Sequence, residues 1–270
     1  MTITSMDGLV AALGASQDLK LYLPSVTNVA GGWVNLNLAG TSSFGILATP
    51  TAYGSGGTTY TQTAGTAGYP HWTAGTGTVS YLARLNATFA SAGALFVYDL
   101  MWACSGFSGI VTTAQTVVSF SGMPTRNTTG LGCEIWVYCT TATGATASNI
   151  TCSYTNQAGV SGHTTVSTAM ITSMPAGRMF QLLLQSGDTG VQSIQSITLS
   201  ASTGTAGSFG VMIVNRLATI GGLVPNVTNQ FDFAGLGLPV VSDSSCLMFV
   251  NLASTTSSGI IYAAADIAQG

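Results

Sequence analysis

Residues 133–139 read CEIWVYC, and this segment indicates most clearly which fold the chain adopts. Alternate residues of a strand point to opposite faces, so its two cysteines share one face with Ile135 and Val137. Glu134 and the two aromatic residues of the segment fall on the other face. This period of two is typical of a β-strand.

Further strand-like runs lie on either side of this segment. They are rich in β-branched and aromatic residues, and Gly-, Ser- or Thr-rich breaks separate them: ALFVYDLMWA (94–103), RMFQLLLQ (178–185), SIQSITLSA (193–201) and FGVMIVN (209–215). Strands spaced by roughly 10 to 17 residues, with no helical pattern between them, predict an all-β fold. We expect an antiparallel β-sandwich or jelly-roll-like core with an extended N-terminal arm and loops.

Three segments that differ in composition and hydrophobic pattern predict the domain organisation. Residues 1–80 are expected to form an N-terminal segment with an extended arm or loop that contacts a partner, residues 81–220 the β-sandwich core, and residues 221–270 C-terminal strands or a second arm. The low-complexity stretch at 51–78 has no core-forming period and is expected to be an extended arm or a long surface loop.

One short helix is expected near the N-terminus. Ser5 is a candidate N-cap, Asp7 lies in the first turn, and Gly14 ends the helix. Leu9, Val10 and Leu13 are expected to share one apolar face that packs on the rest of the protein.

Charge is scarce along the whole chain. Asp, Glu, Lys and Arg make up 5% of the 270 residues, against about 25% in ordinary soluble domains. None of these residue types occurs from Leu21 to Ala83. A surface without charge is typical of a chain covered by neighbours or by lipid. No apolar run approaches the roughly 20 residues that a spanning helix needs, so we expect a subunit of a large assembly and no membrane partner.

Composition also bears on partners and location. The net charge is −3, and the five Lys and Arg residues are scattered singly along the chain. Nucleic-acid binding requires clustered basic residues, so no nucleic-acid partner is expected. The N-terminal sequence MTITSMDGLVAALG lacks the basic start of a signal peptide, and we expect synthesis in a cytoplasm with no export step.

The five cysteines form no C-x-x-C pair, and the chain has only two histidines. This pattern makes a zinc site improbable, so we expect no metal and no cofactor. Buried free thiols that pack as small apolar groups are the favoured interpretation, with a disulfide that stabilises the assembly as the alternative.

The sequence offers two weak catalytic constellations. Ser161, His163 and Asp188 can be written as a triad, but Ser161 does not lie in a G-x-S-x-G elbow. Asp99 and Glu134 can be written as a glycosidase pair, but each lies inside an apolar run. A buried carboxylate needs a partner, and we expect Asp99 to be hydrogen-bonded or paired with an arginine such as Arg84 or Arg216. The sequence therefore predicts a protein that is not an enzyme.

Aromatic residues within residues 1–80 are candidate contacts with a partner. They are Trp33, Tyr53, Tyr60, Tyr69, His71 and Trp72. His71 and Trp72 also fit an incidental exposed pair. If the chain binds carbohydrate, Trp72 and the three tyrosines are the expected stacking platforms.

Several motifs in residues 81–201 resemble virion structural proteins of tailed bacteriophages, of the head-decoration or cement type. The motifs are YLARLNATFASAGALFVYDLMW (81–102), TTAQTV (112–117), SYTNQAGVSGHTT (153–165) and LLLQSGDTGVQSIQSITLSA (182–201). They cover about half of the chain and carry no chemistry. In the family pattern an arginine follows the aspartate of the first motif, whereas this chain has Leu100 at that position. This difference argues against an Asp–Arg contact shared with the family.

The resemblance implies a non-enzymatic capsid decoration protein on the virion surface. Its implied partners are the major capsid protein and further copies of itself, most simply as a homotrimer that stabilises contacts between capsomers. The alternatives are a tail tube, adaptor or fibre component, or a carbohydrate-binding β-sandwich on the particle surface.

Overall fold

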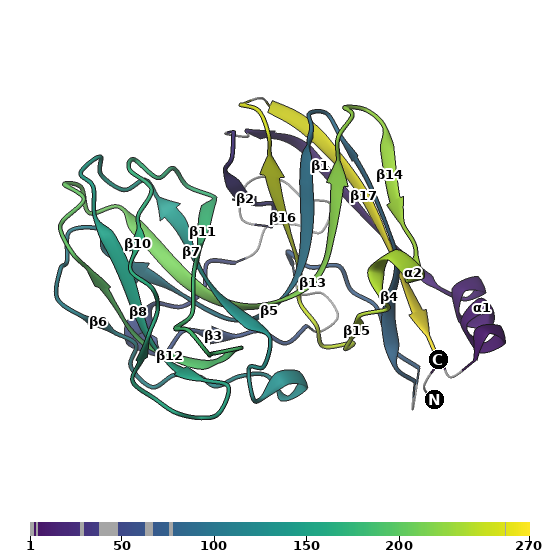
Figure 1. Cartoon of the computed structure of the whole chain (residues 1–270), viewed down its shortest axis with the longest axis horizontal. Helices are drawn as coiled ribbons and strands as arrows, with labels where there is room; N and C mark the ends of the chain where they lie inside the picture. Colours follow the sequence, from purple (N-terminus) through teal and green to yellow (C-terminus); the bar gives the residue numbers. More distant parts are fainter. Residues whose placement is uncertain are drawn as a thin grey trace. The chain divides into compact units, whose positions relative to one another are not determined.

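The structure is a computed structural model that describes residues 3, 5–27, 30–37, 48–62, 67–75, 78–256 and 258–270. The described chain is dominated by β-strands that pair antiparallel, which confirms the predicted all-β fold class (Figure 1). The elements in chain order are α1 (Met6–Gly14), β1 (Gln17–Thr27), β2 (Trp33–Asn35), β3 (Thr58–Thr59), β4 (Ser80–Phe89), β5 (Gly93–Phe107), β6 (Gln115–Thr116), β7 (Cys133–Thr141), β8 (Asn149–Asn156), β9 (His163–Thr164), β10 (Thr168–Ala169), β11 (Arg178–Leu182), β12 (Val191–Leu199), β13 (Ser208–Gly222), β14 (Thr228–Phe231), α2 (Phe233–Leu236), β15 (Val240–Val241), β16 (Leu247–Ala253) and β17 (Ser258–Gln269), with 3₁₀ turns at Tyr53–Ser55 and Thr125–Asn127.

The chain folds into two compact units. Unit 1 comprises Met1–Leu47, Gln62–Tyr98 and Leu217–Gly270, and unit 2 comprises Ala48–Thr61 and Asp99–Arg216. These limits differ from the boundaries expected at residues 80 and 220. The reason is strand pairing, because β4 joins β17 and β14 in the sheet of unit 1.

Unit 1 is a β-sandwich. One sheet has the strand order β1-β17-β4-β14, with β15 beside β4. The facing layer contains β2 paired with β16, together with the first half of β5 and the second half of β13. Alternate residues of β17, such as Ile261, Ala265 and Ile267, point inward and meet Leu95 and Phe249 of the facing layer in one core.

The N-terminal residues of unit 1 correct the expectation of an extended arm. Strand β1 pairs with β17 over almost its whole length, from Gln17 opposite Ile267 to Thr27 opposite Ser258. The chain therefore uses this segment as a sheet strand, since pairing satisfies its backbone groups. Residues 38–47 lie outside the described residues.

Helix α1 begins and ends where the sequence predicts. The Ser5 hydroxyl accepts a hydrogen bond of 3.1 Å from the Gly8 amide, and the helix ends at Gly14. The buried face of the helix differs from the predicted face at Val10, which is 62% exposed. Leu9 and Ala12 are buried. Ala12 packs on small residues of β4 and β17, which leave room for the close approach of the helix.

Unit 2 is a second β-sandwich. Strand β8 lies between β10 and β12 in one sheet, and β7 lies between β11 and β13 in the other layer. Cys133, Ile135, Val137 and Cys139 all point into the core between the layers, as the alternation of CEIWVYC predicts. The opposite face of this strand is also largely covered, because Trp136 and Tyr138 are buried as well.

Residues 221–270 complete the sheets of unit 1 and do not form a second arm. β14, β15 and β17 all pair with β4, and β16 pairs with β2. The C-terminal strand β17 lies between β1 and β4 (Figure 1). The two ends of the sequence thus meet in one sheet.

Candidate functional site

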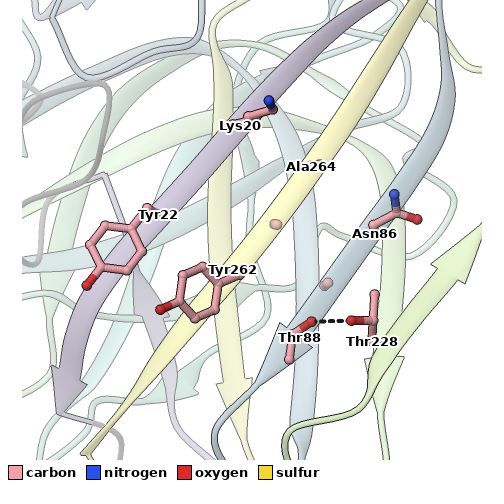
Figure 2. Close-up of a pocket in the computed structure, with 9 residues that line it drawn as sticks. Lys20, Tyr22, Asn86, Thr88, Thr228, Tyr262 and Ala264 are labelled. Atoms are coloured by element: carbon pink, nitrogen blue, oxygen red, sulfur yellow. Dashed lines mark hydrogen bonds between the residues drawn. The ribbon is translucent and has the colours of Figure 1, made fainter.

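The outer face of the unit 1 sheet carries a shallow hollow, shown in Figure 2. Strand alternation places Tyr22, Tyr262, Thr88 and Thr228 in one cross-strand row, because each lies opposite the next in the register. The tyrosine rings lie 5.1 Å apart between centroids and are tilted by 37°. Their side chains are 42% and 51% exposed, which is high for paired aromatic residues.

The neighbouring row creates the hollow. Ala264 lies between Lys20 of β1 and Asn86 of β4 in the register, and its methyl group is much shorter than either neighbour. The space above it has a volume of about 440 Å³. Its lining is mainly apolar, with the Lys20, Asn86, Thr88 and Thr228 side chains contributing the polar groups.

A second exposed surface lies on the loop that connects β13 to β14, two strands of different sheets. Leu223 is 90% exposed, Val224 is 56% exposed and Val227 is 49% exposed. Asn226 has a φ of 61° and donates its amide to the Phe89 carbonyl at 2.7 Å, which fixes the turn against the end of β4. Adjacent exposed apolar side chains of this kind mark interaction surfaces.

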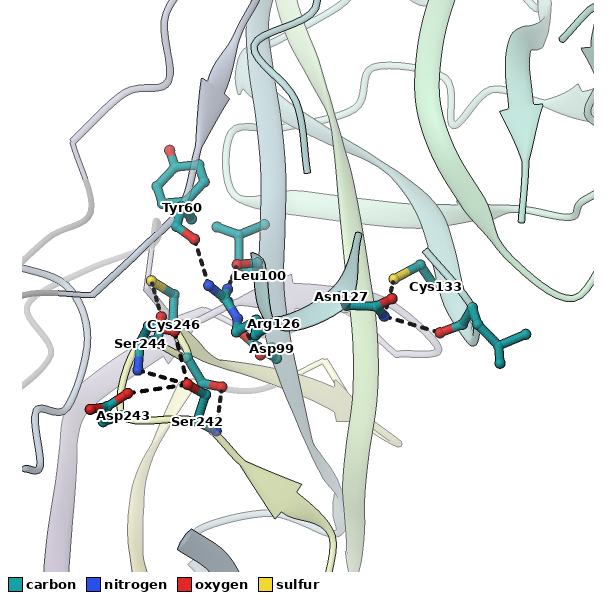
Figure 3. A network of polar contacts seen from close by, with 12 residues as sticks. Tyr60, Asp99, Leu100, Arg126, Asn127, Cys133, Ser242, Asp243, Ser244 and Cys246 are labelled. Carbon is teal, nitrogen blue, oxygen red and sulfur yellow. Dashed lines mark hydrogen bonds and ion pairs between the residues drawn. The ribbon is translucent and has the colours of Figure 1, made fainter. Parts of the chain in front are cut away.

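Asp99 lies in a buried ion pair with Arg126 (Figure 3). Arg126 Nε and Nη2 donate to the two carboxylate oxygens at 2.8 Å each. The guanidinium also donates to the carbonyls of Tyr60 and Leu100, at 2.8 Å in both cases. Asp99 is therefore paired with an arginine, as predicted, and the same arginine also contacts the backbone at Leu100.

Arg84 and Arg216, the partners expected for Asp99, pair elsewhere. Arg84 lies directly opposite Asp266 in the register of β4 and β17, and its Nε donates to that carboxylate at 2.5 Å. Arg216 Nε lies 3.9 Å from Glu134, which also accepts a hydrogen bond from Trp136. Strand pairing explains this difference from the prediction, because it determines which charges meet. The sequence alone does not show which strands pair.

The remaining charges also have local roles within the chain. Lys20 lies 3.5 Å from Asp18, and Asp232 caps the N-terminus of α2 by accepting from two backbone amides. Asp7 lies in the first turn of α1, where a negative charge is favourable. Arg178 is buried, and burial lowers the pKa of its guanidinium from the usual value.

Two members of the candidate triad of Ser161, His163 and Asp188 lie close together in unit 2, namely His163 and Asp188. His163 Nδ1 lies 2.7 Å from Asp188 Oδ2, and Tyr154 and Asn156 donate hydrogen bonds of 2.5 and 2.9 Å to the same carboxylate. Burial favours a raised pKa for Asp188, but these hydrogen bonds and the nearby histidine outweigh it and lower the pKa. Ser161 makes no hydrogen bond to His163 within the described part of the chain, so this geometry supplies no nucleophile.

All five cysteines are buried free thiols, which confirms that expectation. Burial raises the pKa of Cys133 to about 12 and that of Cys139 to about 11. Burial also raises the pKa of Cys104 and of Cys152 well above the usual range. Within the described ranges, no group of three or more His, Cys, Asp or Glu side chains is arranged to hold a metal ion.

Three of the six partner-contact candidates predicted from residues 1–80 are buried. Tyr60, Tyr69 and Trp72 are 8%, 3% and 1% exposed and so cannot form an open stacking platform. Trp72 belongs to the core of unit 1, because the low-complexity segment packs against the sheets.

The other candidates are partly accessible. Tyr53 is half-buried and stacks on Phe107 at 4.7 Å, and Trp33 is half-buried against Phe96 at 4.5 Å. His71 is exposed, as expected for an incidental surface residue.

The exposed tyrosine pair and the apolar β13–β14 loop were missed by sequence reasoning. The alternations LKLYL and YAAADIA place Tyr22 and Tyr262 on polar faces, which was a usable signal. Their proximity depends on the pairing of the first and last strands, and no local pattern reports that pairing.

Comparisons with known proteins give little. No protein-family model matches the chain, and no curated protein does so either. Among solved structures, the chain is similar to the infectious bursal disease virus Gx strain structure, with 12% identity over 93% of this chain and 80% of that chain, and a TM-score of 0.21. The infectious bursal disease virus VP2 subviral particle gives 11% identity, 94% and 80% coverage, and a TM-score of 0.20. Scores this low do not establish a common fold.

One further observation concerns membranes. Among the described residues, no helix combines the length and the apolar character that crossing a bilayer requires.

Proposed function

We propose that this chain is a non-enzymatic structural protein of a tailed-phage particle, most specifically a capsid decoration or cement protein. It binds the outer shell as a homo-oligomer, with a trimer as the simplest form, and stabilises contacts between capsomers of the major capsid protein. The resemblance of residues 81–201 to such proteins supports this proposal, and the physical character of the chain supports it independently.

The observation that carries the proposal is the use of charge. Four of the five basic residues, namely Lys20, Arg84, Arg126 and Arg216, lie in ion pairs within the chain. Because the chain has only five Lys and Arg and eight Asp and Glu among its 270 residues, its exposed side chains are mainly hydroxyl, amide and apolar groups. An isolated monomer gains solubility from net surface charge, whereas a subunit covered by neighbours does not need it.

The β13–β14 loop is the apolar anchor that this proposal assigns to shell contact. Leu223, Val224 and Val227 are exposed together on a turn fixed by Asn226. Burial of these side chains against a capsid subunit stabilises the complex by the hydrophobic effect. Because few charges take part, attachment is expected to depend only weakly on salt. Several copies bound around a symmetric shell would dissociate slowly.

The proposal is tested on virions made by the genome that encodes this chain. Immunogold electron microscopy with an antibody against the chain is expected to label the head. Label confined to the tail would overturn the decoration role in favour of a tube, adaptor or fibre component. Absence of label from intact particles would overturn a virion role.

A binding assay with shells that lack the chain tests the contact surface. The wild-type chain is expected to bind at both low and high salt, and Leu223→Asp with Val224→Asp is expected to abolish binding. Val160→Asp is the matched control, because Val160 is 52% exposed but lies in unit 2. Equal binding by the Leu223→Asp, Val224→Asp variant would show that this loop is not part of the interface.

A further inference from the structure

We infer that the hollow above Ala264 on the outer face of the unit 1 sheet binds a neutral sugar ring. This inference goes beyond attachment to a shell, because it assigns a small-molecule site to a surface that the shell role does not use. It rests on the shape of the hollow, on its aromatic wall and on the chemistry of the polar groups around it.

The shape follows directly from strand register. The paired tyrosines form one wall, and Lys20 and Asn86 stand on either side of Ala264 (Figure 2). The volume of about 440 Å³ falls within the usual range of roughly 300 to 1,000 Å³ for ligand sites. Rigid strands supply every lining residue, so the site is formed before a ligand arrives.

The tyrosine wall suits a ligand that is apolar on one face. A pyranose has one face of C–H groups and carries its hydroxyls around the edge. Aromatic rings pack against such C–H groups, and tyrosine adds a hydroxyl that hydrogen-bonds at the wet side of the contact. Tyr22 and Tyr262 are already held 5.1 Å apart by their strands, so little side-chain freedom is lost on binding.

The polar groups around the hollow suit hydroxyl partners. The Asn86 side chain lines the hollow, and its amide oxygen is buried without a hydrogen-bond partner among the described residues. Thr88 and Thr228 form a hydrogen bond of 2.7 Å with each other, which still leaves acceptor capacity on their oxygens. Sugar hydroxyls both donate and accept, so they match an amide beside two threonine hydroxyls.

The charge at the site favours a neutral ligand. Lys20 is the only charged residue in the lining, and its ammonium lies 3.5 Å from the Asp18 carboxylate. No carboxylate lines the hollow, so the site lacks the acid pair that glycoside hydrolysis uses. The chemistry here is therefore that of sugar binding and not of sugar cleavage.

The test uses the full chain and three neutral oligosaccharides as probes: maltohexaose, cellohexaose and chitohexaose. Saturation-transfer NMR is expected to detect binding of at least one, and titration calorimetry then measures its affinity. Tyr262→Ala is expected to weaken that affinity about tenfold or more, because it removes half of the aromatic wall. Tyr262→Phe keeps the ring and is expected to bind within about threefold of wild type.

Two further variants test whether sugar binding depends on the hollow itself and not on a general change in the protein surface. Ala264→Gln fills the hollow while keeping both tyrosines in the sequence, and it is expected to abolish binding. Phe231→Ala is the matched control, because Phe231 is 40% exposed on β14 of the same sheet but does not line the hollow. Circular dichroism and thermal unfolding confirm that each variant is folded.

Two results would overturn the inference. One is the absence of binding to all three probes by the folded wild-type chain. The other is binding that Tyr262→Ala and Ala264→Gln leave unchanged. If no probe binds and Tyr262→Ala instead changes the native mass, the face is an interface between copies of the chain and the sugar site is rejected.

Discussion

Arg126 donates to both carboxylate oxygens of Asp99 through hydrogen bonds of 2.8 Å, and both side chains are more than nine-tenths buried. The same guanidinium donates to the carbonyls of Tyr60 and Leu100. One side chain therefore joins the segment that directly follows β3, the middle of β5 and the turn that contains Arg126.

Asp99→Asn is expected to destabilise the protein by about 3–5 kcal/mol, because it leaves the Arg126 charge buried without an anionic partner. Chemical denaturation at neutral pH measures this change. Asp18→Asn breaks the exposed pair with Lys20 and serves as the control, with an expected effect of about 1 kcal/mol or less. An unchanged melting temperature for Asp99→Asn would show that the buried pair contributes no net stability.

The lowered pKa of Asp188 predicts a pH dependence of stability. The folded-state pKa lies below the unfolded value of about 3.8, so the ionised carboxylate stabilises the folded chain above that value. This stabilisation is lost as the pH falls through the folded-state pKa. Asp188→Asn is therefore expected to unfold more readily than wild type at pH 7, with a smaller difference at about pH 3. The same difference at both pH values would contradict the role of Tyr154, Asn156 and His163 around this carboxylate.

The five thiols are expected to resist alkylation in the native protein. The reactive form of cysteine is the thiolate, and burial raises the pKa of Cys133 to about 12, so little thiolate is present at pH 8. Mass spectrometry after treatment with iodoacetamide is expected to show no modification before unfolding and five modifications afterwards. Rapid native modification of Cys104 or Cys246 would show that one of these buried sites opens readily.

Gly222 is expected to tolerate no side chain. A Cβ atom there would lie 2.2 Å from Cδ2 of the buried Phe89 ring, so Gly222→Ala is expected to destabilise the chain by about 1–3 kcal/mol. Gly221→Ala is the matched control, because no atom lies within 4 Å of a Cβ at that position. Equal melting temperatures for the two variants would show that Phe89 moves aside without cost.

Local pattern predicted the parts of this protein that depend on local chemistry. The Ser5 cap and the end of α1 at Gly14 follow from helix-capping rules, and the inward face of CEIWVYC follows from strand alternation. The buried free thiols also follow from composition and spacing.

Long-range pairing explains what the sequence did not reveal. Arg126 meets Asp99 across 27 residues, and Arg84 meets Asp266 across 182. The hollow beside Tyr22 and Tyr262 exists only because the first and last strands are neighbours. Trp72 looked exposed because its segment is rich in Gly and Thr, yet its indole ring lies in the unit 1 core. Such features depend on which strands pair, and a single sequence does not encode that pairing in a local signal.

The native mass of the purified chain tests the central claim most directly, because the claim is that this nearly uncharged surface is covered in an assembly. Size-exclusion chromatography with light scattering, at micromolar concentration and physiological salt, makes the measurement. We expect an oligomer, in its simplest form a trimer with three times the 27.3 kDa of one chain. A stable, soluble monomer of 27.3 kDa would contradict the inference from missing charge.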